Sequence, residues 1–334
     1  MDQARIRVAI IGAGQWGREH ARAFTARPEV ELCAICSRSP ERAGARSGEF
    51  GGRPYTDIEE MLDAEEPDLV AVCLPNESHF ESTLRVIRAG YPLLVEKPLV
   101  FNLAEADILL TEAAARGLFF AINFNHRYAR PVRLAVEAIR TGRLGQPIFA
   151  TWRFGGEPGT SAHAHANLIE TQCHGFDLLE HLCGPVASVM AEMTDQTGRG
   201  WSTTAIALRF ASGAVGSVVG TYDSSYAYPG TQMLEINGTA GRILIEDTVR
   251  RYAYSATGSE MCEVWQAGYF NDADRAFHCT IDRHLEDLLA AFVQGKRPPV
   301  PAAAGRRALM LAQAAINSFE SGIRVAIEPE QGLA

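Results

Sequence analysis

The sequence lacks the blocks of positive charge that bind nucleic acids or anionic membranes. Its 334 residues include 31 Lys and Arg against 40 Asp and Glu, which gives a formal net charge of −9. No Lys/Arg block stands out along the chain. Because both polyanions need a cationic surface, we expect neither nucleic acid nor a membrane as a partner.

Long apolar runs are also missing. No window of the sequence reaches the length of a membrane span. The opening residues lead directly into an apolar strand, without the basic flank, long apolar core and cleavage site of a signal peptide. We therefore expect a cytoplasmic protein.

Cysteine occurs only seven times, an odd number scattered along the chain. Free thiols are more typical of such a chain than a disulfide framework. Cys33 and Cys36 have the C-x-x-C spacing of redox and metal sites. They fall inside the apolar run 30–36, where cysteine is commonly a small buried side chain. We favour that interpretation.

The length of 334 residues favours two domains. With 47% hydrophobic residues, the chain has enough apolar side chains for two cores. Residues 1–122 alternate short apolar runs with stretches of helical spacing. This alternation is typical of a parallel sheet covered on both faces. We therefore expect an α/β Rossmann domain with a doubly wound parallel sheet. Its expected strands are 8–11, 30–36, 69–74, 93–95 and 118–122, and its expected helices are 15–26, 40–50, 58–64, 78–89 and 103–116.

Residues 123–334 have a different rhythm. After a helical stretch at 132–140, apolar segments follow one another with turn signals such as Ser212-Gly213. We expect an α+β domain with a large, mostly antiparallel open sheet and helices on one side. Its expected strands are 148–154, 186–193, 205–210, 215–222, 233–237 and 243–246, and its last helices are 284–294 and 306–318.

The segment Gly12-Ala13-Gly14-Gln15-Trp16-Gly17 fits the pattern G-x-G-x-x-G. It follows the first expected strand and opens the first helix, which is the context of a dinucleotide-binding turn. Glycine permits the tight turn and the close approach of a pyrophosphate to the helix N-terminus. A glycine-rich turn without a ligand is the alternative. We expect cofactor binding by Gly12, Gly14, Gln15, Trp16 and Gly17.

The second expected strand runs into Ser37 and Arg38, about twenty residues past the glycines. An acidic residue there would bind the ribose 2′-hydroxyl of NAD, and none is present. A serine hydroxyl and a guanidinium suit the 2′-phosphate of NADP. We favour NADP over NAD, with the alternative that Arg38 stacks on adenine while Ser37 bonds either ribose.

Several later segments resemble one known family. They are Leu74-Pro75-Asn76-Glu77-Ser78-His79, Glu96-Lys97-Pro98, Asn125-His126-Arg127-Tyr128, Gly142-x-x-Gly145 and His174-Gly175-Phe176-Asp177. Together with the glycine turn, they resemble the glucose–fructose oxidoreductase, inositol dehydrogenase and rhizopine-catabolism family, Gfo/Idh/MocA, over nearly the whole chain. The resemblance implies an NAD(P)-dependent enzyme that transfers a hydride between the cofactor and a secondary alcohol or ketone of a sugar, sugar derivative or cyclitol.

The same resemblance implies roles for single residues. His174 is the proton-transfer residue, and Glu96 and Lys97 lie where cofactor and substrate meet. A lysine there could stabilise a developing alkoxide, and a solvated surface lysine is the alternative. The resemblance also implies a cis Lys97–Pro98 bond. The nicotinamide end is assigned to Pro75, Asn76 and His79. Further cofactor contacts are assigned to Leu74 and Arg127, and substrate contacts to Lys97, His165, His174 and Asp177.

A polar stripe marks the expected helix 167–183, with Asn167 as its N-cap and Gly184 as its end. At about 100° per residue, the stripe joins Glu170, His174, Asp177 and His181. The rest of the helix is largely apolar, so we expect the stripe to face a cleft. Glu170 would then orient or charge His174.

Other interpretations of the stripe stay open. Asn167 and Glu170 have the spacing of a capping box, and His181 is also typical of a core or rim histidine. A metal could use Glu170 and His174 with His163, His165 or His181, although we expect none because no zinc spacing is present. Many family members carry aspartate where this chain has Glu170. His163 and His165 either enter the substrate pocket or face solvent.

Two other functions fit the same motifs. One is a glycoside-cleaving enzyme of similar fold that oxidises its substrate transiently and returns the hydride. The other is a dinucleotide sensor without catalysis. We also expect a homodimer or homotetramer, because the apolar sheet of the second domain is too extensive to leave wholly in water.

Overall fold

The computed structural model describes residues 5–75, 78–159, 161–268 and 276–328. The chain forms two compact units. The first contains the residues up to Phe124 together with Ile281–Arg306, and the second contains Asn125–Thr280 and the residues from Arg307 onward. Compact units and folding domains need not coincide, so the expected domains 1–122 and 123–334 stay a prediction.

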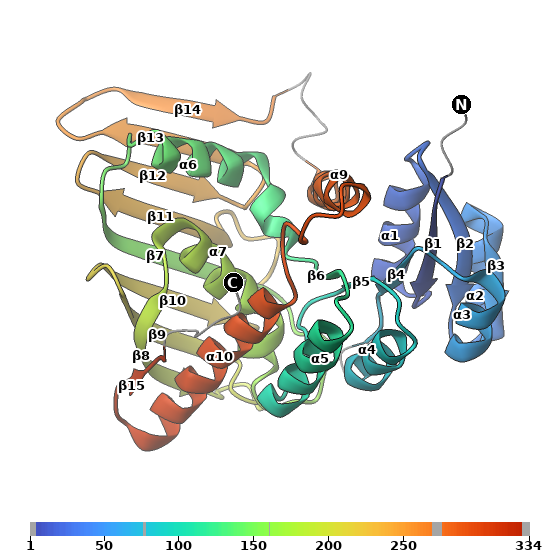
Figure 1. The fold of residues 1–334 in the computed structure, drawn as a ribbon. Coiled ribbons are helices and arrows are strands. Elements are labelled where there is room, and N and C mark those ends of the chain that lie inside the picture. The colour runs from blue at the N-terminus through green and yellow to red at the C-terminus, as the bar shows by residue number, and fades with distance from the viewer. Residues whose placement is uncertain (1–4, 76–77, 160, 269–275, 329–334) are drawn as a thin grey trace. The chain divides into compact units, whose positions relative to one another are not determined.

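The first unit is built on a parallel six-stranded sheet in the order β3-β2-β1-β4-β5-β6 (Figure 1). This is the doubly wound order of dinucleotide-binding folds, and it reverses between β1 and β4. The predicted Rossmann fold is confirmed. The strands are β1 Ile6–Ile11, β2 Val30–Cys36, β3 Arg53–Tyr55, β4 Leu69–Val72, β5 Leu93–Val95 and β6 Phe120–Ile122, and the helices are α1 Gln15–Thr25, α2 Pro40–Phe50, α3 Ile58–Glu65, α4 His79–Arg88 and α5 Leu103–Ala115.

Side-chain caps explain where three of these helices begin. The side chains of Ser39, Asp57 and Asn102 accept hydrogen bonds from backbone N–H groups of α2, α3 and α5. Each satisfies a donor that has no partner within the helix. The short edge strand β3 was not expected, because its three residues carry no apolar run.

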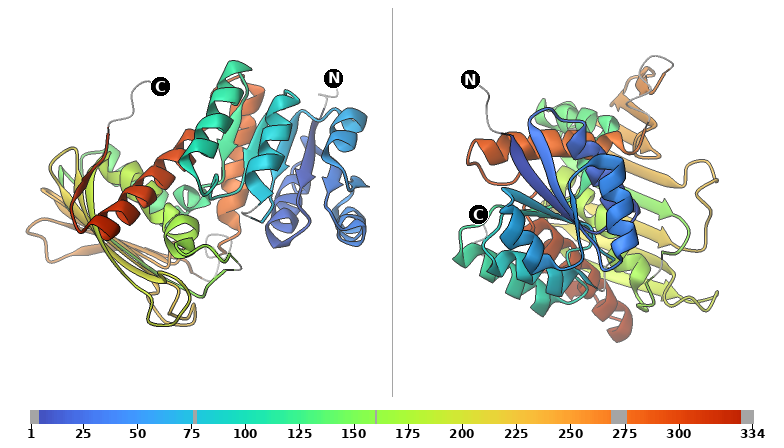
Figure 2. Two further views of the ribbon diagram at one scale, coloured as in Figure 1. Left: turned by 90° about the horizontal axis from the view of Figure 1, so that it is seen from below. Right: turned by 90° about the vertical axis from the view of Figure 1, so that its right-hand side faces the viewer.

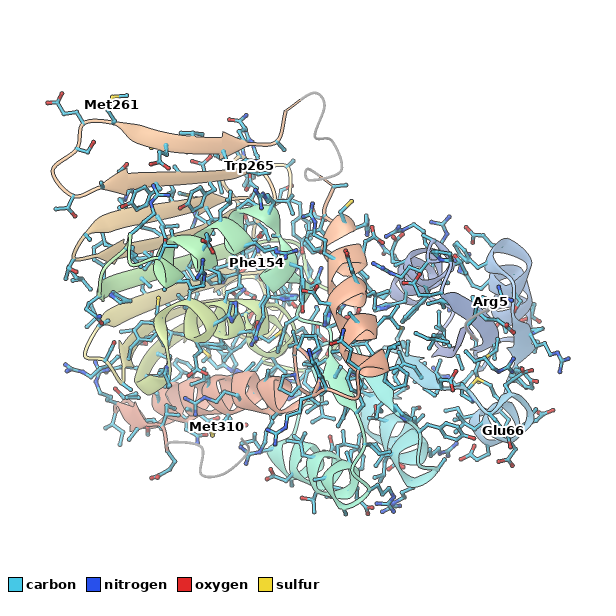
Figure 3. All side chains as sticks on the ribbon, turned by 45° about the horizontal axis from the view of Figure 1, so that its top comes forward. Arg5, Glu66, Phe154, Met261, Trp265 and Met310 are labelled. Atoms are coloured by element: carbon cyan, nitrogen blue, oxygen red, sulfur yellow. The ribbon has the colours of Figure 1, made fainter. Side chains whose placement is uncertain are left out.

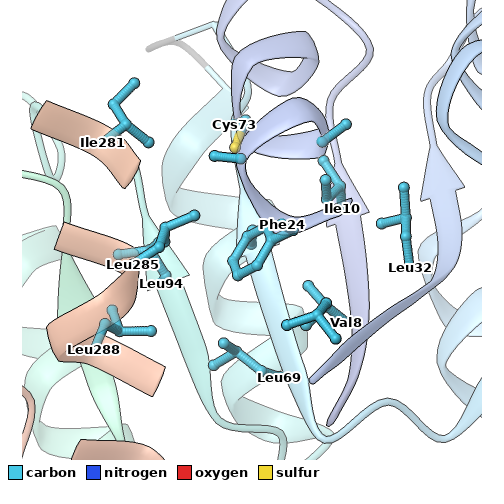
Figure 4. Close-up of a cluster of buried hydrophobic side chains, with 14 of the residues drawn as sticks. Val8, Ile10, Phe24, Leu32, Leu69, Cys73, Leu94, Ile281, Leu285 and Leu288 are labelled. Atoms are coloured by element: carbon cyan, nitrogen blue, oxygen red, sulfur yellow. The ribbon is translucent and has the colours of Figure 1, made fainter. Parts of the chain in front are cut away.

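Helix α9, Cys279–Val293, contributes to the core of the first unit. Its side chains Ile281, Leu285 and Leu288 are fully buried and pack in one cluster with Phe24 and Leu94 (Figure 4). Sequence rhythm placed this helix with the second sheet. A helix buries its apolar face against whichever core fits it, so rhythm alone does not identify its partner.

The second unit holds a nine-stranded sheet in the order β14-β13-β12-β11-β7-β10-β9-β8-β15. Within this sheet, as far as the structure describes it, β7 and β10 pair in parallel and every other pair of neighbours is antiparallel. Helices α6 and α7 and the second-unit part of α10 lie on one face of this sheet (Figure 2), so the predicted α+β fold is confirmed. The elements are α6 Arg130–Arg140, β7 Pro147–Gly155, α7 Cys173–Cys183, β8 Val186–Thr194, β9 Thr203–Phe210, β10 Val215–Thr221, β11 Gln232–Gly238, β12 Gly241–Glu246, β13 Arg251–Ala256, β14 Cys262–Gln266, α10 Ala303–Ser321 and β15 Val325–Ala326.

Strands β13 and β14 extend the sheet beyond the predicted strands. Met261, in the turn that joins them, is well exposed (Figure 3). Most of β14 is exposed too, so it has no buried face whose alternation could reveal it. Within the described ranges, no helix has the length and apolarity to cross a membrane.

Candidate active site

The glycine turn leaves room for a ligand on one side only. Gly12 has φ of 121°, and a Cβ there would lie 2.2 Å from the Cys73 carbonyl oxygen. A Cβ at Gly17 would lie 1.8 Å from the Gly12 oxygen, whereas one at Gly14 would meet nothing within 4 Å. The turn therefore packs tightly against β4 and is open beside Gly14, the N-cap of α1. An open helix N-terminus of this kind fits a pyrophosphate.

Ser37 and Arg38 lie beside that turn. They directly follow β2, which pairs with β1, and the Gly12 N–H donates to the Cys36 oxygen at 2.8 Å. Arg38 is exposed and Ser37 half-buried. Both side chains are thus at the carboxyl edge of the sheet, where ligands bind in open α/β folds. Exposed Gln15 and Trp16 complete this edge at the start of α1.

His79 forms hydrogen bonds that hold the segment after β4 in place. This imidazole is buried, with Nε2 2.8 Å from the Leu74 oxygen and Nδ1 2.9 Å from the Pro98 oxygen. It therefore connects the loops that follow β4 and β5. Pro75 is exposed on the first of these loops. Asn76, predicted to line the nicotinamide end, lies outside the described residues.

Lys97 follows β5 on the same edge of the sheet. It is half-buried and is one of only two lysines in the chain; the other is Lys296. The Lys97–Pro98 bond is cis, which confirms the prediction from the family resemblance. Glu96, in contrast, is buried, and its carboxylate contacts His20.

The polar stripe of the second unit begins on an unusual helical turn. Residues Asn167–Thr171 are wound as a π-helix that runs into α7, and the Gln172 N–H donates to the Asn167 oxygen. The predicted N-cap role of Asn167 is wrong. The backbone of Ala166 is already helical, and the Asn167 amide instead bonds the Ser202 oxygen and the Gln172 side chain. Turns of π-helix are rare and frequently occur at functional sites.

His174 lies on the first turn of α7, where it is buried. Its ring stacks on that of His126, which lies on the short helix Asn125–Tyr128. The His126 ring also meets Phe277 edge-on, at a centroid distance of 5.4 Å. The proposed proton-transfer residue therefore has one ring face covered by a second imidazole.

Asp177 and Arg127 form a bidentate ion pair. Arg127 Nε donates to Oδ2 at 2.8 Å and Nη2 donates to Oδ1 at 2.5 Å. Burial raises the pKa of Asp177, while Arg127 lowers it. These residues were expected to contact substrate and cofactor separately. In the structure Arg127 and Asp177 instead pair with each other, and this ion pair links the short helix Asn125–Tyr128 to α7.

The Glu170 carboxylate contacts Tyr222 at the end of β10. Glu170 Oε2 accepts from the Tyr222 hydroxyl at 3.3 Å, and both side chains are buried. Burial raises the pKa of Tyr222, so this hydroxyl keeps its proton and donates. The contact places Glu170 inside the fold, away from the helix-start role of a capping box.

The remaining histidines of the second unit differ in their surroundings. Much of the His163 side chain is exposed. Its partial desolvation lowers the pKa of the imidazole by more than the negative charge of Glu170 raises it. The His165 ring stacks on Trp201 at a centroid distance of 6.4 Å. His181 is exposed. Of the four residues in the predicted stripe, Glu170, His174 and Asp177 are thus buried, whereas His181 is exposed.

No group of three or more His, Cys, Asp or Glu in the described ranges is arranged to hold a metal ion. Cys33 and Cys36 are buried, and burial raises the pKa of each thiol to about 11. Neither is therefore a thiolate at neutral pH.

Sequence analysis overlooked three polar partners of these residues. His20 lies four residues before Phe24, on the buried face of α1, and a polar residue on such a face was the available signal. Tyr222 was assigned only to an expected strand. The role of His126 depends on a contact between segments far apart in sequence, which periodicity cannot reveal.

Comparison with known proteins agrees with this geometry. A family model described as the oxidoreductase family with an NAD-binding Rossmann fold matches residues 6–124. A second, described as the GFO/IDH/MocA C-terminal domain, matches residues 132–244. The fold and these matches define an NAD-binding oxidoreductase. The chain belongs to the Gfo/Idh/MocA family, as its motifs predicted.

Curated relatives match nearly the whole chain or a large part of it. Myo-inositol 2-dehydrogenase of Thermotoga maritima is 27% identical over 97% of this chain and 99% of its own length. D-glucoside 3-dehydrogenase of Escherichia coli is 32% identical over 59% of this chain and 60% of its own length. The solved structure of levoglucosan dehydrogenase with NADH and levoglucosan shares the fold, with a TM-score of 0.88, 20% identity and coverage of 97% of this chain and 100% of that chain.

Proposed function

We propose that this oxidoreductase interconverts a secondary alcohol and a ketone on a sugar, sugar derivative or cyclitol. The observation that carries the proposal is the position of Lys97. This half-buried lysine follows β5 at the carboxyl edge of the sheet that also carries the open glycine turn. The names of the relatives, which include an inositol and a glucoside dehydrogenase, support the substrate class.

Two side chains divide the work on the reacting hydroxyl. Lys97 donates a hydrogen bond to the oxygen and stabilises the negative charge that develops as the C–H bond breaks. His174 accepts the hydroxyl proton as general base. The Glu170 carboxylate orients the His174 imidazole or stabilises its protonated form. When bound, the nicotinamide supplies the hydride acceptor. The glycine turn would hold the pyrophosphate at the N-terminus of α1.

Arg38 favours NADP over NAD in this proposal. Its exposed guanidinium, next to the Ser37 hydroxyl, offers charge-assisted hydrogen bonds to a 2′-phosphate. The solved complexes of two similar folds contain NADH. Those proteins are only 20% identical to this chain, so their cofactor says little about Arg38.

We further propose a homo-oligomer built through the sheet face of the second unit, in the cytoplasm. Met190, Val215 and Val219 are exposed on strands β8 and β10. Contiguous exposed apolar side chains are typical of interfaces. Val219→Glu would place a charge beside Arg153, its neighbour on β7, so the subunit should stay folded. Light scattering would then show a smaller species than for the wild type, and an unchanged mass would exclude this face.

Reduction of NAD and NADP with a panel of sugars, cyclitols and dihydrodiols tests the proposed activity. Net formation of reduced cofactor with a cyclic polyol is the expected result. Cleavage of a glycoside without net change in reduced cofactor would favour the glycoside-cleaving alternative. Cofactor binding without turnover of any compound would favour a dinucleotide sensor.

A further inference from the structure

Four polar side chains meet in the interior of the first unit. They come from four elements: His20 from α1, Glu96 from the end of β5, Asn123 from the end of β6 and His284 from α9. None is more than 5% exposed. The His20 ring lies 6.2 Å from the ring of Phe24, which belongs to the buried apolar cluster that also contains Leu94 and Ile281. A polar cluster in such a place needs an explanation, because burying polar groups costs free energy unless they are hydrogen-bonded.

The cluster is joined by short hydrogen bonds. Glu96 Oε1 lies 2.7 Å from His20 Nε2 and accepts from Asn123 Nδ2 at 2.7 Å. Asn123 Oδ1 lies 2.8 Å from His284 Nδ1. One oxygen of the carboxylate is therefore held from both sides by residues that other elements position.

The charges in the cluster agree with this arrangement. Burial opposes protonation of His20, but its contacts with Cys73 and Glu96 raise the pKa of the imidazole to about 10. Burial raises the pKa of Glu96. The hydrogen bonds from His20 and Asn123, together with the charges of His20 and Lys97, lower it by more, so the net direction is down. Both directions favour a buried ion pair. Such pairs often stabilise a fold no better than apolar residues of the same volume, so stability alone gives a weak reason for this one.

The second carboxylate oxygen leads to Lys97. Glu96 Oε2 accepts the backbone N–H of Lys97 at 3.2 Å. The Lys97 peptide is thereby tied, through one side chain, to His20 on the helix that begins at the glycine turn. With both oxygens engaged and the side chain buried, Glu96 is directed inward and not toward the open edge of the sheet.

We propose that Glu96 is a positioning residue for Lys97, supported by His20 and Asn123, and is not a ligand of the cofactor. This inference deepens the proposed function, because it rests on the role of Lys97 there. The network fixes the peptide from which the Lys97 side chain extends. Small displacements of such a group reduce turnover while leaving cofactor affinity intact.

Glu96→Gln tests the inference, because an amide cannot satisfy both sides. If its oxygen accepts from His20 and Asn123, its NH₂ group meets the donating N–H of Lys97. We expect kcat to fall by about tenfold or more, with the Kd for NAD(P)H unchanged within about threefold. Tyr91→Phe is the control, since it removes the hydrogen bond to the Leu62 oxygen in the same unit without touching Glu96. Its kcat should equal that of the wild type.

A readout independent of turnover separates this inference from the proposed function. Lys97 and Lys296 are the only lysines in the sequence. Treatment with an amine-acylating reagent, followed by peptide mass spectrometry, therefore measures the acylation rate of Lys97 relative to that of exposed Lys296. Glu96→Gln should change the acylation rate of Lys97 at least about threefold relative to Lys296, and His20→Gln, which keeps a donor toward Glu96, should change it less. Weakened cofactor binding with unchanged Lys97 acylation would overturn the inference and make Glu96 a cofactor ligand. Normal acylation shifts with no activity on any alcohol would instead contradict the proposed function alone.

Discussion

His126 and His174 stack face to face, with ring centroids 3.8 Å apart and planes inclined by 4°. Both rings are buried, and Phe277 meets His126 edge-on. The stack restricts rotation of the imidazole that we propose as general base. A base must point its nitrogen at the proton it removes, so His126 is expected to hold that direction.

Substitution of His126 should therefore affect turnover according to the shape of the new side chain. His126→Ala removes the covering ring, and we expect kcat to fall by about tenfold or more. His126→Phe keeps a flat ring and should retain most of the activity. Steady-state kinetics with cofactor titration measure this, and equal loss in both variants would show that the stack is not what matters.

His174 and Glu170 should have separable effects on the oxidation of the alcohol. His174→Ala should lower kcat on the order of 10²–10⁴-fold with cofactor affinity nearly intact. Glu170→Gln should shift the pH–rate profile to lower pH, because the imidazolium loses a stabilising charge and the neutral base forms more readily. Glu170→Asp keeps the charge and should be milder. Lower thermal stability with an unmoved profile would make Glu170 purely structural.

Tyr222→Phe provides a matched control for that experiment. It removes the hydroxyl that contacts Glu170 at 3.3 Å but leaves the carboxylate in place. Its pH–rate profile should move less than that of Glu170→Gln. A larger shift would assign the effect to the tyrosine.

The His20–Glu96 pair predicts a loss of stability at high pH. In the unfolded chain His20 has its ordinary pKa of 6.5. In the folded chain burial lowers the pKa of His20, but Cys73 and Glu96 raise it by more, so that it reaches about 10. The stabilisation from the bound proton is therefore full below pH 6.5 and is lost as pH rises through about 10. Urea unfolding at about pH 6.5 and about pH 10 should show the advantage of the wild type over His20→Gln shrinking. An advantage that stays constant, or that shrinks equally for exposed His181→Gln, would refute the assignment.

Arg38→Ala should weaken NADP more than NAD, because it removes a contact to a phosphate that only NADP carries. Titration of both reduced cofactors by fluorescence measures the ratio of their Kd values. Arg88→Ala, an exposed arginine on α4, should leave that ratio unchanged. Equal losses for both cofactors would show that Arg38 does not recognise the 2′-phosphate.

Much of the first unit could be predicted because its local signals agree. Unbroken apolar strands, the N-caps at Ser39 and Asp57, and the glycine turn each specify a local conformation that the sheet retains. The sequence predicted the elements that carry Lys97 and His174. It did not predict that Arg127 would pair with Asp177, since residues 50 positions apart meet only through tertiary packing.

The inward direction of Glu96 was equally hidden. Its neighbours in sequence suggest a ligand site, and its actual partners His20 and Asn123 are 76 and 27 residues away. Similarly, the buried face of α9 could be recognised as apolar, but the core that it joins could not. Patterns within one element identify a face, while contacts between elements decide what that face meets.

The most direct test of the account is to follow the hydrogen on the reacting carbon. An alcohol that the wild type oxidises is labelled with deuterium at its carbinol carbon, and mass spectrometry of the products shows where the label goes. We expect one deuterium in the reduced nicotinamide for each ketone formed, and Lys97→Met should slow this transfer without changing its stoichiometry. Deuterium that returns to the organic product, or ketone formed without label in the cofactor, would contradict the account.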